Sequence, residues 1–254
     1  MAVGSYRFGS RLFVGTGKYQ SWETMQAAIE ASGTELVTVA LRRVNLDNPA
    51  EPSLLDFIPK SVQLLPNTAG CHTVEEALAV AELARASGIG DLIKLEVIGD
   101  DPLLWPDPIA TVEATERLSD RGFTVMVYTS PDPVLAVRLE RAGAAAVMPL
   151  GSPIGSGRGV LDTESVLRIK ERVAVPVVVD AGIGGPADAA LAMEIGADAV
   201  LINTAIAKAR DPVAMARAMR LAVEAGRMGY LAGRMAPQPA AVPSSPTTGM
   251  IGRP

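Results

Sequence analysis

Lys94 is the residue of this sequence that points most directly to chemistry. It lies inside a short apolar run, residues 91–98, with glycines on both sides. The run has the composition of a β-strand, and a buried ammonium group is costly unless it is paired or gives up its proton. A lysine kept neutral by apolar surroundings is a nucleophile, and its usual reaction is imine formation with a carbonyl compound. The alternative is a lysine that pairs with a buried carboxylate for structural reasons alone.

Two carboxylates are candidates to assist Lys94. Strand alternation places Leu92, Lys94 and Glu96 on one face of the run. Asp180 ends a second apolar run, two residues before a glycine. An imine-forming lysine needs acid–base groups that expel water and move protons on the neighbouring carbon. Either carboxylate could instead neutralise Lys94 or cap local N–H groups, and both roles stay open from the residues alone.

Three turns that follow the last predicted strands suggest a phosphate site. Gly155 lies in the glycine-rich segment 150–159, Gly182 lies in segment 179–186, and Asn203 with Thr204 ends the last run. Turns after the late strands of a barrel commonly hold a substrate phosphate on backbone N–H groups. Glycines also serve simply to allow tight turns. Three such turns in succession favour phosphate binding.

The remaining reactive side chains do not form a known catalytic pattern. His72 is the only histidine, and one histidine makes neither a histidine-based metal site nor a hydrolase triad. The sequence contains no HExxH, CxxC or Walker motif. Cys71 is expected to be a small core residue and His72 a structural one. We therefore expect no metal and no cofactor.

Composition limits the possible partners and location. The chain has 254 residues, 48% of them hydrophobic, and a net charge of −5. This charge provides no long-range attraction to nucleic acid or to an anionic membrane, so an anionic substrate needs a local positive site. A single cysteine excludes an intrachain disulfide, no run approaches the ~18 apolar residues of a membrane span, and the start lacks a signal-peptide core. We expect a cytoplasmic protein.

Short apolar runs alternate along the chain with longer segments of helical spacing. This order is typical of an α/β fold with a parallel sheet, and the length favours closure into a single-domain, phosphate-binding (β/α)8 TIM barrel. An open doubly wound sheet is the structural alternative. The expected strands are residues 12–15, 36–40, 62–66, 92–98, 124–128, 145–150, 175–181 and 199–203, and the clearest helices are residues 74–86, 132–142, 163–173, 187–195 and 212–225.

Local signals also predict where helices and domains begin and end. Thr73, with Glu76 three positions on, predicts a capping box, and Ser130 before Pro131 predicts another helix start. We expect a barrel domain over residues 1–235. The tail, residues 236–254, is rich in Pro, Ser, Thr and Gly, a composition typical of disorder.

Taken together, these segments are similar to thiazole synthase of bacterial thiamine biosynthesis. The similarity runs in order over almost the whole chain. One departure is the segment 236–242, which is richer in proline and alanine than the family's usual approach to its tail. The matching segments are residues 12–19, 39–43, 65–71, 93–98, 148–156, 180–184, 201–207, 232–234 and 244–246.

The resemblance implies a usually oligomeric barrel in which Lys94 forms an imine with 1-deoxy-D-xylulose 5-phosphate. It also implies that sulfur arrives as the thiocarboxylate of a small sulfur-carrier protein, and that condensation with dehydroglycine closes the thiazole ring. By the same resemblance, Glu96 and Asp180 are the acid–base carboxylates. The family positions that bind the sugar phosphate correspond to Gly155, Ala181, Gly182, Asn203 and Thr204.

Two other functions fit the same residues less fully. Another lysine-imine barrel acting on a sugar phosphate, of the class I aldolase or pyridoxal phosphate synthase type, would use Lys94 and the same turns. A non-catalytic barrel acting as a scaffold would need neither. The long polar connection, residues 42–60, offers Arg42 and Arg43 to an acidic partner, so we expect the carrier to dock there.

Overall fold

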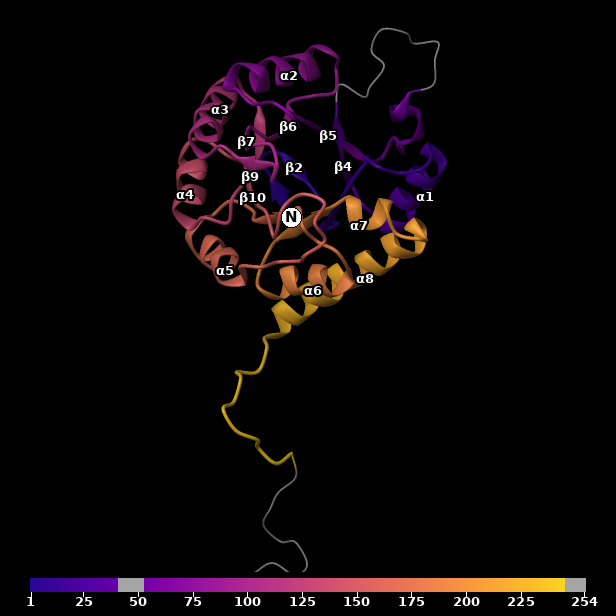
Figure 1. Ribbon diagram of the computed structural model, residues 1–254, viewed down its shortest axis with the longest axis vertical. Coiled ribbons are helices and arrows are strands. Elements are labelled where there is room, and N and C mark those ends of the chain that lie inside the picture. Colours follow the sequence, from indigo (N-terminus) through magenta and orange to yellow (C-terminus); the bar gives the residue numbers. More distant parts are fainter. Residues whose placement is uncertain (41–52, 245–254) are drawn as a thin grey trace, which may run out of the picture.

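Eight parallel strands close into a barrel in the computed structural model, which describes residues 1–40 and 53–244 (Figure 1). Bridges from Val147 to Val177 and from Leu150 to Asp180 join the first and last strands of the sheet. This closure confirms the barrel and rules out the open sheet. In chain order, the strands of this barrel are β3 (Leu12–Gly15), β4 (Leu36–Ala40), β5 (Gln63–Asn67), β6 (Leu92–Leu95), β9 (Thr124–Thr129), β10 (Ala146–Pro149), β11 (Val178–Asp180) and β12 (Ala199–Ile202).

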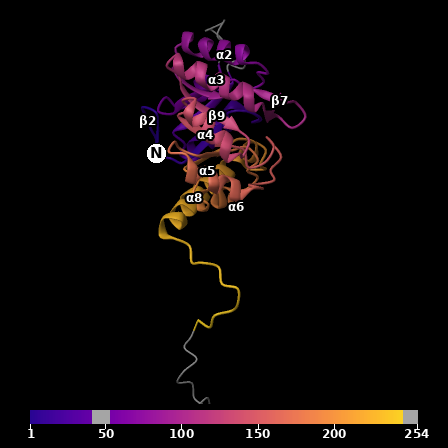
Figure 2. The same cartoon turned by 90° about the vertical axis from the view of Figure 1, so that its left-hand side faces the viewer.

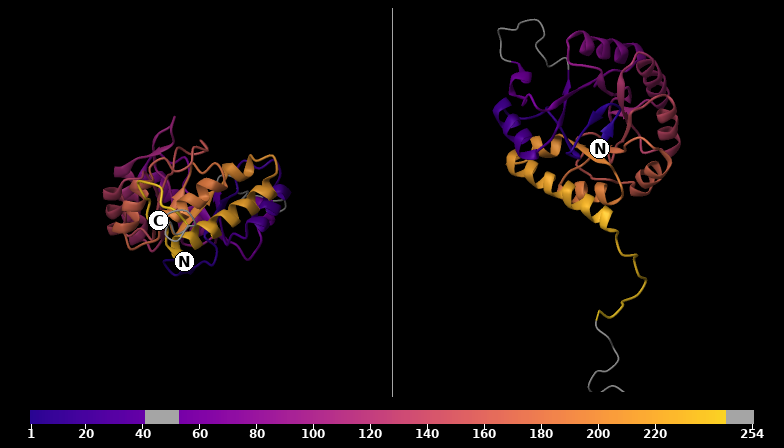
Figure 3. Two further views of the ribbon diagram at one scale, coloured as in Figure 1. Left: turned by 90° about the horizontal axis from the view of Figure 1, so that it is seen from below. Right: turned by 180° about the vertical axis from the view of Figure 1, so that it is seen from behind.

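Helices form an outer ring around these strands, as the view from behind in Figure 3 shows. Each of the five segments that the sequence analysis named as a helix is a helix in the structure. The sequence analysis did not name α1 or α3. Between β4 and β5 the described residues contain a short 3-10 turn, η2 (Leu54–Phe57). The helices are α1 (Trp22–Ser32), α2 (Val74–Ala86), α3 (Pro108–Asp120), α4 (Pro133–Arg141), α5 (Thr163–Arg172), α6 (Pro186–Glu194), α7 (Thr204–Ala207) and α8 (Pro212–Ala232).

One predicted helix start is confirmed and one is wrong. The Thr73 hydroxyl accepts from the Glu76 N–H, and the Glu76 carboxylate accepts from the Thr73 N–H, each at 3.2 Å. Helix α4 does not start at the Ser130 signal but at Pro133, capped by Asp132. The Asp132 carboxylate accepts from two backbone N–H groups of the first turn, at 2.7 and 3.1 Å. A carboxylate cap followed by proline is the stronger signal, because proline has no N–H to leave unpaired.

Side chains of alternating strand positions fill two separate layers. Leu92 packs in the barrel interior with Phe13 and Met126, whereas Ile93 and Leu95 pack in the outer layer beneath the helices. The predicted alternation in β6 is therefore confirmed, and it points Lys94 into the barrel.

The N-terminal hairpin closes one end of the barrel. Its strands are β1 (Ala2–Val3) and β2 (Tyr6–Arg7), and Val3 and Phe8 join the interior cluster. The other end, where the parallel strands terminate, carries a second hairpin of β7 (Ile98–Asp100) and β8 (Trp105–Pro106). Figure 2 shows this hairpin projecting on the side away from the N-terminus. The open end is thus the end where catalytic residues of such barrels lie.

The barrel strand that carries Lys94 is shorter than predicted. Strand β6 ends at Leu95, and Ile98 already belongs to the β7–β8 hairpin. At Glu96 the Thr68 side chain replaces the strand partner: its hydroxyl accepts from the Glu96 N–H at 2.8 Å and donates to the Glu96 carbonyl at 2.7 Å. A threonine directly after the neighbouring strand β5 therefore ends the ladder, which the apolar run itself does not reveal.

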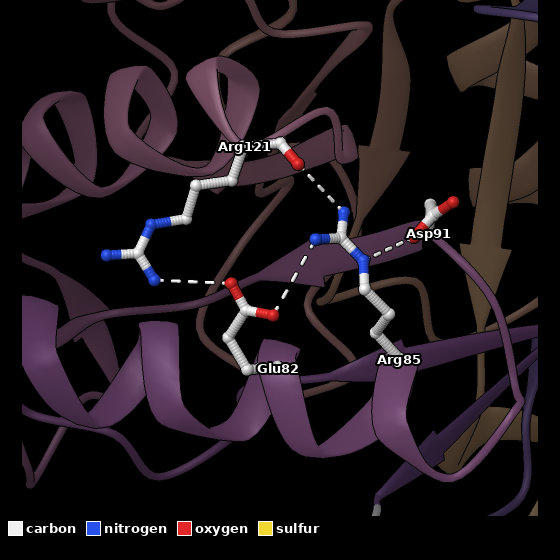
Figure 4. A network of polar contacts seen from close by, with 4 residues as sticks. All are labelled: Glu82, Arg85, Asp91 and Arg121. Atoms are coloured by element: carbon white, nitrogen blue, oxygen red, sulfur yellow. Dashed lines mark hydrogen bonds and ion pairs between the residues drawn. The ribbon is translucent and has the colours of Figure 1, made fainter.

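A polar network on the outer surface holds the start of β6 (Figure 4). Arg85 of α2 binds Asp91 with 2.5 Å between Nε and Oδ1, and it donates to the Arg121 carbonyl at 3.0 Å. Arg121 in turn donates to Glu82 at 3.2 Å. Exposed ion pairs contribute little singly, but these link the ends of α2 and α3 to the residue that precedes β6.

Helix α8 extends past residue 225, the predicted end, to Ala232. Beyond it, residues 233–244 leave the barrel without forming a helix or strand (Figure 1). Within the described ranges, no helix combines the length and apolar character that crossing a bilayer requires.

Candidate active site

A cavity of about 370 Å³ opens at the carboxyl ends of the strands. Its walls come from the ends of β6, β11 and β12 and from the loop after β10. The structure brings together in this cavity every site residue that the sequence predicted: Lys94, Glu96, Gly155, Asp180, Ala181, Gly182, Asn203 and Thr204.

Lys94 lies between two carboxylates deep in the cavity. Its Nζ is 3.2 Å from Oε1 of Glu96 and forms an ion pair with Oδ2 of Asp180. The three residues are only 6%, 5% and 3% exposed, respectively. Because solvent screens these charges little, each protonation state depends strongly on the other two.

The two carboxylates favour the protonated form of Lys94. Burial by itself lowers the pKa of Lys94, but the charges of Asp180 and Glu96 outweigh burial and raise that pKa above its ordinary value. This corrects the expectation of a lysine kept neutral by apolar surroundings. The apolar run is local to β6, whereas the Asp180 charge comes from a strand far along the chain.

Asp180 is suited to accept a proton from Lys94. Burial raises the pKa of its carboxyl group by more than the Lys94 charge lowers it, and the Glu96 charge raises it further. The end of β11 also fixes its position, because the Gly151 N–H donates to the Asp180 carbonyl at 3.2 Å. Transfer of one proton within this pair gives a neutral amine without exposing the lysine to solvent.

A second group of residues that line the cavity presents backbone donors. The N–H groups of Gly155, Gly182 and Thr204 have no acceptor among the residues that the structure describes. Gly155 and Gly182 have φ values of +74° and +81°, and even Ala181 has a φ of +67°. This backbone conformation is uncommon outside glycine. This conformation turns the loops after β10 and β11 so that their N–H groups can face the cavity.

Lys18 adds a positive charge to this group, although the sequence reasoning did not select it. Its Nζ is 3.4 Å from the Thr204 hydroxyl, and it lines the same cavity. Its position in a Gly-Thr-Gly-Lys segment that begins at the last residue of β3 was the available signal. The local positive site that an anionic substrate needs is therefore present.

Asn203 joins the end of β12 to the loop after β3. With its amide oriented to satisfy its neighbours, the nitrogen donates to the Gly17 carbonyl at 2.8 Å and to the Gly15 carbonyl at 3.3 Å. A Cβ on Gly15 would lie 2.5 Å from the Cβ of Asn203. Only glycine at position 15 therefore lets Asn203 occupy this position.

Comparison with known proteins assigns the family. The family model described as thiazole biosynthesis protein ThiG matches residues 2–246. The chain is 54% identical over 251 residues to the thiazole synthase of Anoxybacillus flavithermus, covering 98% of each chain. It is 55% identical over 253 residues to that of Geobacter sulfurreducens, covering 99% of this chain and 97% of the relative. The chain belongs to the thiazole synthase family.

Membership of the thiazole synthase family makes the chain a sulfur-incorporating enzyme of thiamine biosynthesis. This confirms the function that the resemblance implied and excludes a non-catalytic scaffold. A chain in the crystal structure of the Amycolatopsis orientalis BexX/CysO complex superposes with a TM-score of 0.84 at 36% identity, covering 94% of this chain and 98% of that one. A thiamine phosphate pyrophosphorylase from Pyrococcus furiosus shares only the fold: its TM-score is 0.57 at 19% identity, covering 85% of this chain and 96% of that one.

Residues outside the cavity also have clear positions in this thiazole synthase. Cys71 is buried. The ring of His72 lies 3.2 Å from the Ile98 carbonyl through Nδ1, at the base of the β7–β8 hairpin. Neither residue lines the cavity that contains Lys94. Arg42 and Arg43, the predicted carrier contacts, lie outside the described residues.

The sequence reasoning also missed Tyr128 of β9. Its side chain is completely buried, and its ring centroid lies 5.6 Å from Nζ of Lys94. In β9, Met126 and Tyr128 alternate onto the interior face, so strand periodicity was the signal that could have found it.

Proposed function

We propose that Lys94 forms an imine with the ketone carbon of 1-deoxy-D-xylulose 5-phosphate. The observation that carries this proposal is a buried lysine between two carboxylates on the wall of a cavity large enough for a sugar phosphate. A lysine paired only for structural reasons needs one counter-charge and no cavity. Two carboxylates around one nitrogen supply both the proton acceptor and the proton donor that imine formation requires.

The proposed reaction begins with proton transfer from Lys94 to Asp180. The neutral amine then adds to the ketone carbon: the C–N bond forms, the electron pair of the C=O π bond moves to oxygen, and one N–H proton passes through Glu96 to that oxygen. The resulting hydroxyl leaves as water with the proton that Asp180 took from Lys94. The nitrogen keeps one proton, and the negative charges of Glu96 and Asp180 stabilise the resulting iminium cation. Glu96 then moves protons on the neighbouring carbon.

We propose that the substrate phosphate lies among the N–H groups of Gly155, Gly182 and Thr204, with Ala181 and Asn203 shaping the site. The unpaired donors and the nearby Lys18 ammonium support this placement. Because the whole chain carries a net charge of −5, recognition of a dianion depends on such local donors.

We propose that sulfur arrives as the thiocarboxylate of a sulfur-carrier protein and that dehydroglycine completes the ring. The structural neighbour is a BexX chain in complex with CysO, which supports a protein partner of this kind. We further propose a cytoplasmic homo-oligomer in which residues 1–235 form the barrel domain and residues 236–254 the tail.

Reversing Arg42 and Arg43 to glutamate should weaken carrier binding and spare imine formation. Unchanged carrier affinity would rule out docking at residues 42–60.

Borohydride trapping tests the proposed function. Incubation with 1-deoxy-D-xylulose 5-phosphate and borohydride should add the reduced sugar-phosphate mass to the peptide that contains Lys94. Lys94→Ala should abolish the adduct. Lys18→Ala is the matched control, because Lys18 lines the same cavity. This variant should still form the adduct at Lys94, but it should need a higher substrate concentration than the unaltered protein. An adduct on Lys18, Lys60 or Lys170 in the unaltered protein would contradict the assignment.

A further inference from the structure

The ring of Tyr128 lies behind Lys94 on the interior face of β9. Lys94 is in register with Met126, and Tyr128 is the next interior residue along the same strand. Its ring centroid is 5.6 Å from Nζ of Lys94, yet Tyr128 does not line the cavity. The ring therefore contacts the lysine rather than the open cavity.

The hydroxyl group of Tyr128 is bound to the β7–β8 hairpin. It donates to the Leu104 carbonyl at 3.3 Å, and Leu104 is one of the cavity-lining residues. Leu104 has a φ of +51°, an uncommon conformation for a leucine that surrounding contacts must hold. Burial, followed by the charges of Asp180 and Glu96, raises the pKa of Tyr128, so this hydroxyl stays protonated and remains a donor.

The packing around Tyr128 leaves its ring little freedom. Ile98 and Leu150 are buried in the same cluster, and Trp105 and Ile154 pack against it. Two members of this cluster, Ile98 and Trp105, belong to the hairpin strands. One rigid side chain thus connects the hairpin that borders the cavity to the nitrogen that the proposed reaction uses.

We propose that Tyr128 is a positioning residue for Lys94: its ring holds the cationic nitrogen in place, and its hydroxyl fixes the hairpin beside the cavity. This inference rests on the proposed function of Lys94. An aromatic face within about 6 Å attracts a cation and not a neutral amine. The ring therefore favours the ammonium of the empty enzyme and the iminium of the intermediate over the neutral amine between them.

Three replacements at position 128 separate the ring from the hydroxyl group. Tyr128→Phe keeps the ring and loses the bond to Leu104, whereas Tyr128→Leu keeps an apolar filler and loses the ring. Pentafluorophenylalanine at this position keeps the shape but removes the electron-rich face, and it serves where the leucine variant fails to fold. Leu150→Met is the matched control, because it changes the packing of the same buried cluster but leaves the Tyr128 side chain itself unaltered.

Two readouts distinguish positioning from a purely structural role. The first is the pKa of Lys94 in the substrate-free enzyme, from the pH profile of competitive acylation. The second is the rate of borohydride trapping at saturating 1-deoxy-D-xylulose 5-phosphate. Loss of the aromatic face should shift the labelling profile to lower pH by about one unit, the scale of a desolvated cation–π contact. It should also slow trapping at saturating substrate, because the nitrogen is no longer held in position. Tyr128→Phe should keep both values and instead raise the substrate concentration needed for half-maximal trapping.

Several outcomes would overturn the proposal. A folded Tyr128→Leu or pentafluorophenylalanine variant with an unchanged Lys94 profile and trapping rate would eliminate the role of the ring. An equal shift in Leu150→Met would reduce that role to general packing. Unchanged half-saturation in Tyr128→Phe would eliminate the role of the hydroxyl. The labelling profile needs no substrate, so it judges Tyr128 even if the unaltered enzyme forms no adduct at Lys94, a result that would refute the proposed function instead.

Discussion

Lys94 and Asp180 form an ion pair across the barrel interior, although their strands β6 and β11 are not neighbours in the sheet. Strands β9 and β10 lie between them on the shorter path around the barrel. Only the closure of the barrel brings the carboxylate to the lysine. The charge state of Lys94 is therefore a property of the tertiary fold rather than of the apolar run around it.

Asp180→Asn should lower the pKa of Lys94. The wild-type pKa is raised because two carboxylates outweigh burial, so removing one negative charge leaves Glu96 alone to oppose the lowering effect of burial. The neutral fraction at pH 8 should rise, and each unit of lowered pKa raises it about tenfold. Competitive acylation followed by mass spectrometry measures this fraction, with Lys60 as the internal reference. Labelling of Lys94 that stays equal to wild type across pH 7–10 would contradict the proposed control by Asp180.

Glu96→Gln should leave the fold intact and lower turnover by about 10²-fold or more, the usual scale for a general acid–base group. The hydrogen bonds that fix position 96 to Thr68 involve the backbone of Glu96, so glutamine preserves them. Sugar-phosphate binding should remain, as isothermal titration would show. If Glu96→Gln and Asp180→Asn both turned over at the wild-type rate, the carboxylates would have only a structural role.

The sequence predicted the strands and the buried position of Lys94 because both depend on local pattern. Period-two alternation around Lys94 is visible within seven residues, and the Thr73–Glu76 capping box is visible within four. The glycine turns were also visible, since left-handed backbone conformation at Gly155 and Gly182 depends mainly on the residue itself.

The features that the sequence did not reveal depend on contacts between distant segments. Strand β6 ends where the side chain of Thr68 takes over its hydrogen bonds. Tyr128 looks like an ordinary aromatic core residue until its distance to Lys94 is known. Lys18 is exposed and follows a strand like many surface lysines, so its place beside Thr204 becomes evident only in the folded barrel.

Glu76→Ala should destabilise the protein in a pH-dependent way. The Glu76 carboxylate accepts from the N–H groups of His72 at 2.7 Å and Thr73 at 3.2 Å, and these bonds lower its pKa below 4.5. A carboxyl group with a lowered folded-state pKa stabilises the fold above its unfolded pKa and loses that effect as the pH falls through the folded value. The difference in Tm from wild type should be full at pH 7 and shrink below about pH 5. A difference that stayed constant down to pH 3 would show that the charge of Glu76 is not involved.

Gly155→Ala and Gly182→Ala should have different effects, although both glycines have positive φ values. A Cβ at Gly155 would lie 3.3 Å from the end of the flexible Lys18 side chain, which can move away, whereas a Cβ at Gly182 would lie 2.5 Å from the backbone nitrogen of Ser152.

Gly155→Ala should lower Tm slightly and weaken binding of 1-deoxy-D-xylulose 5-phosphate by roughly tenfold, the free-energy equivalent of one hydrogen bond to a charged group. It should have little effect on binding of the dephosphorylated sugar. Gly182→Ala should lower Tm more and weaken both ligands, because the loop at Ser152 must shift. Isothermal titration with both ligands and thermal unfolding check these outcomes. Equal weakening of the two ligands by Gly155→Ala would place the phosphate away from Gly155.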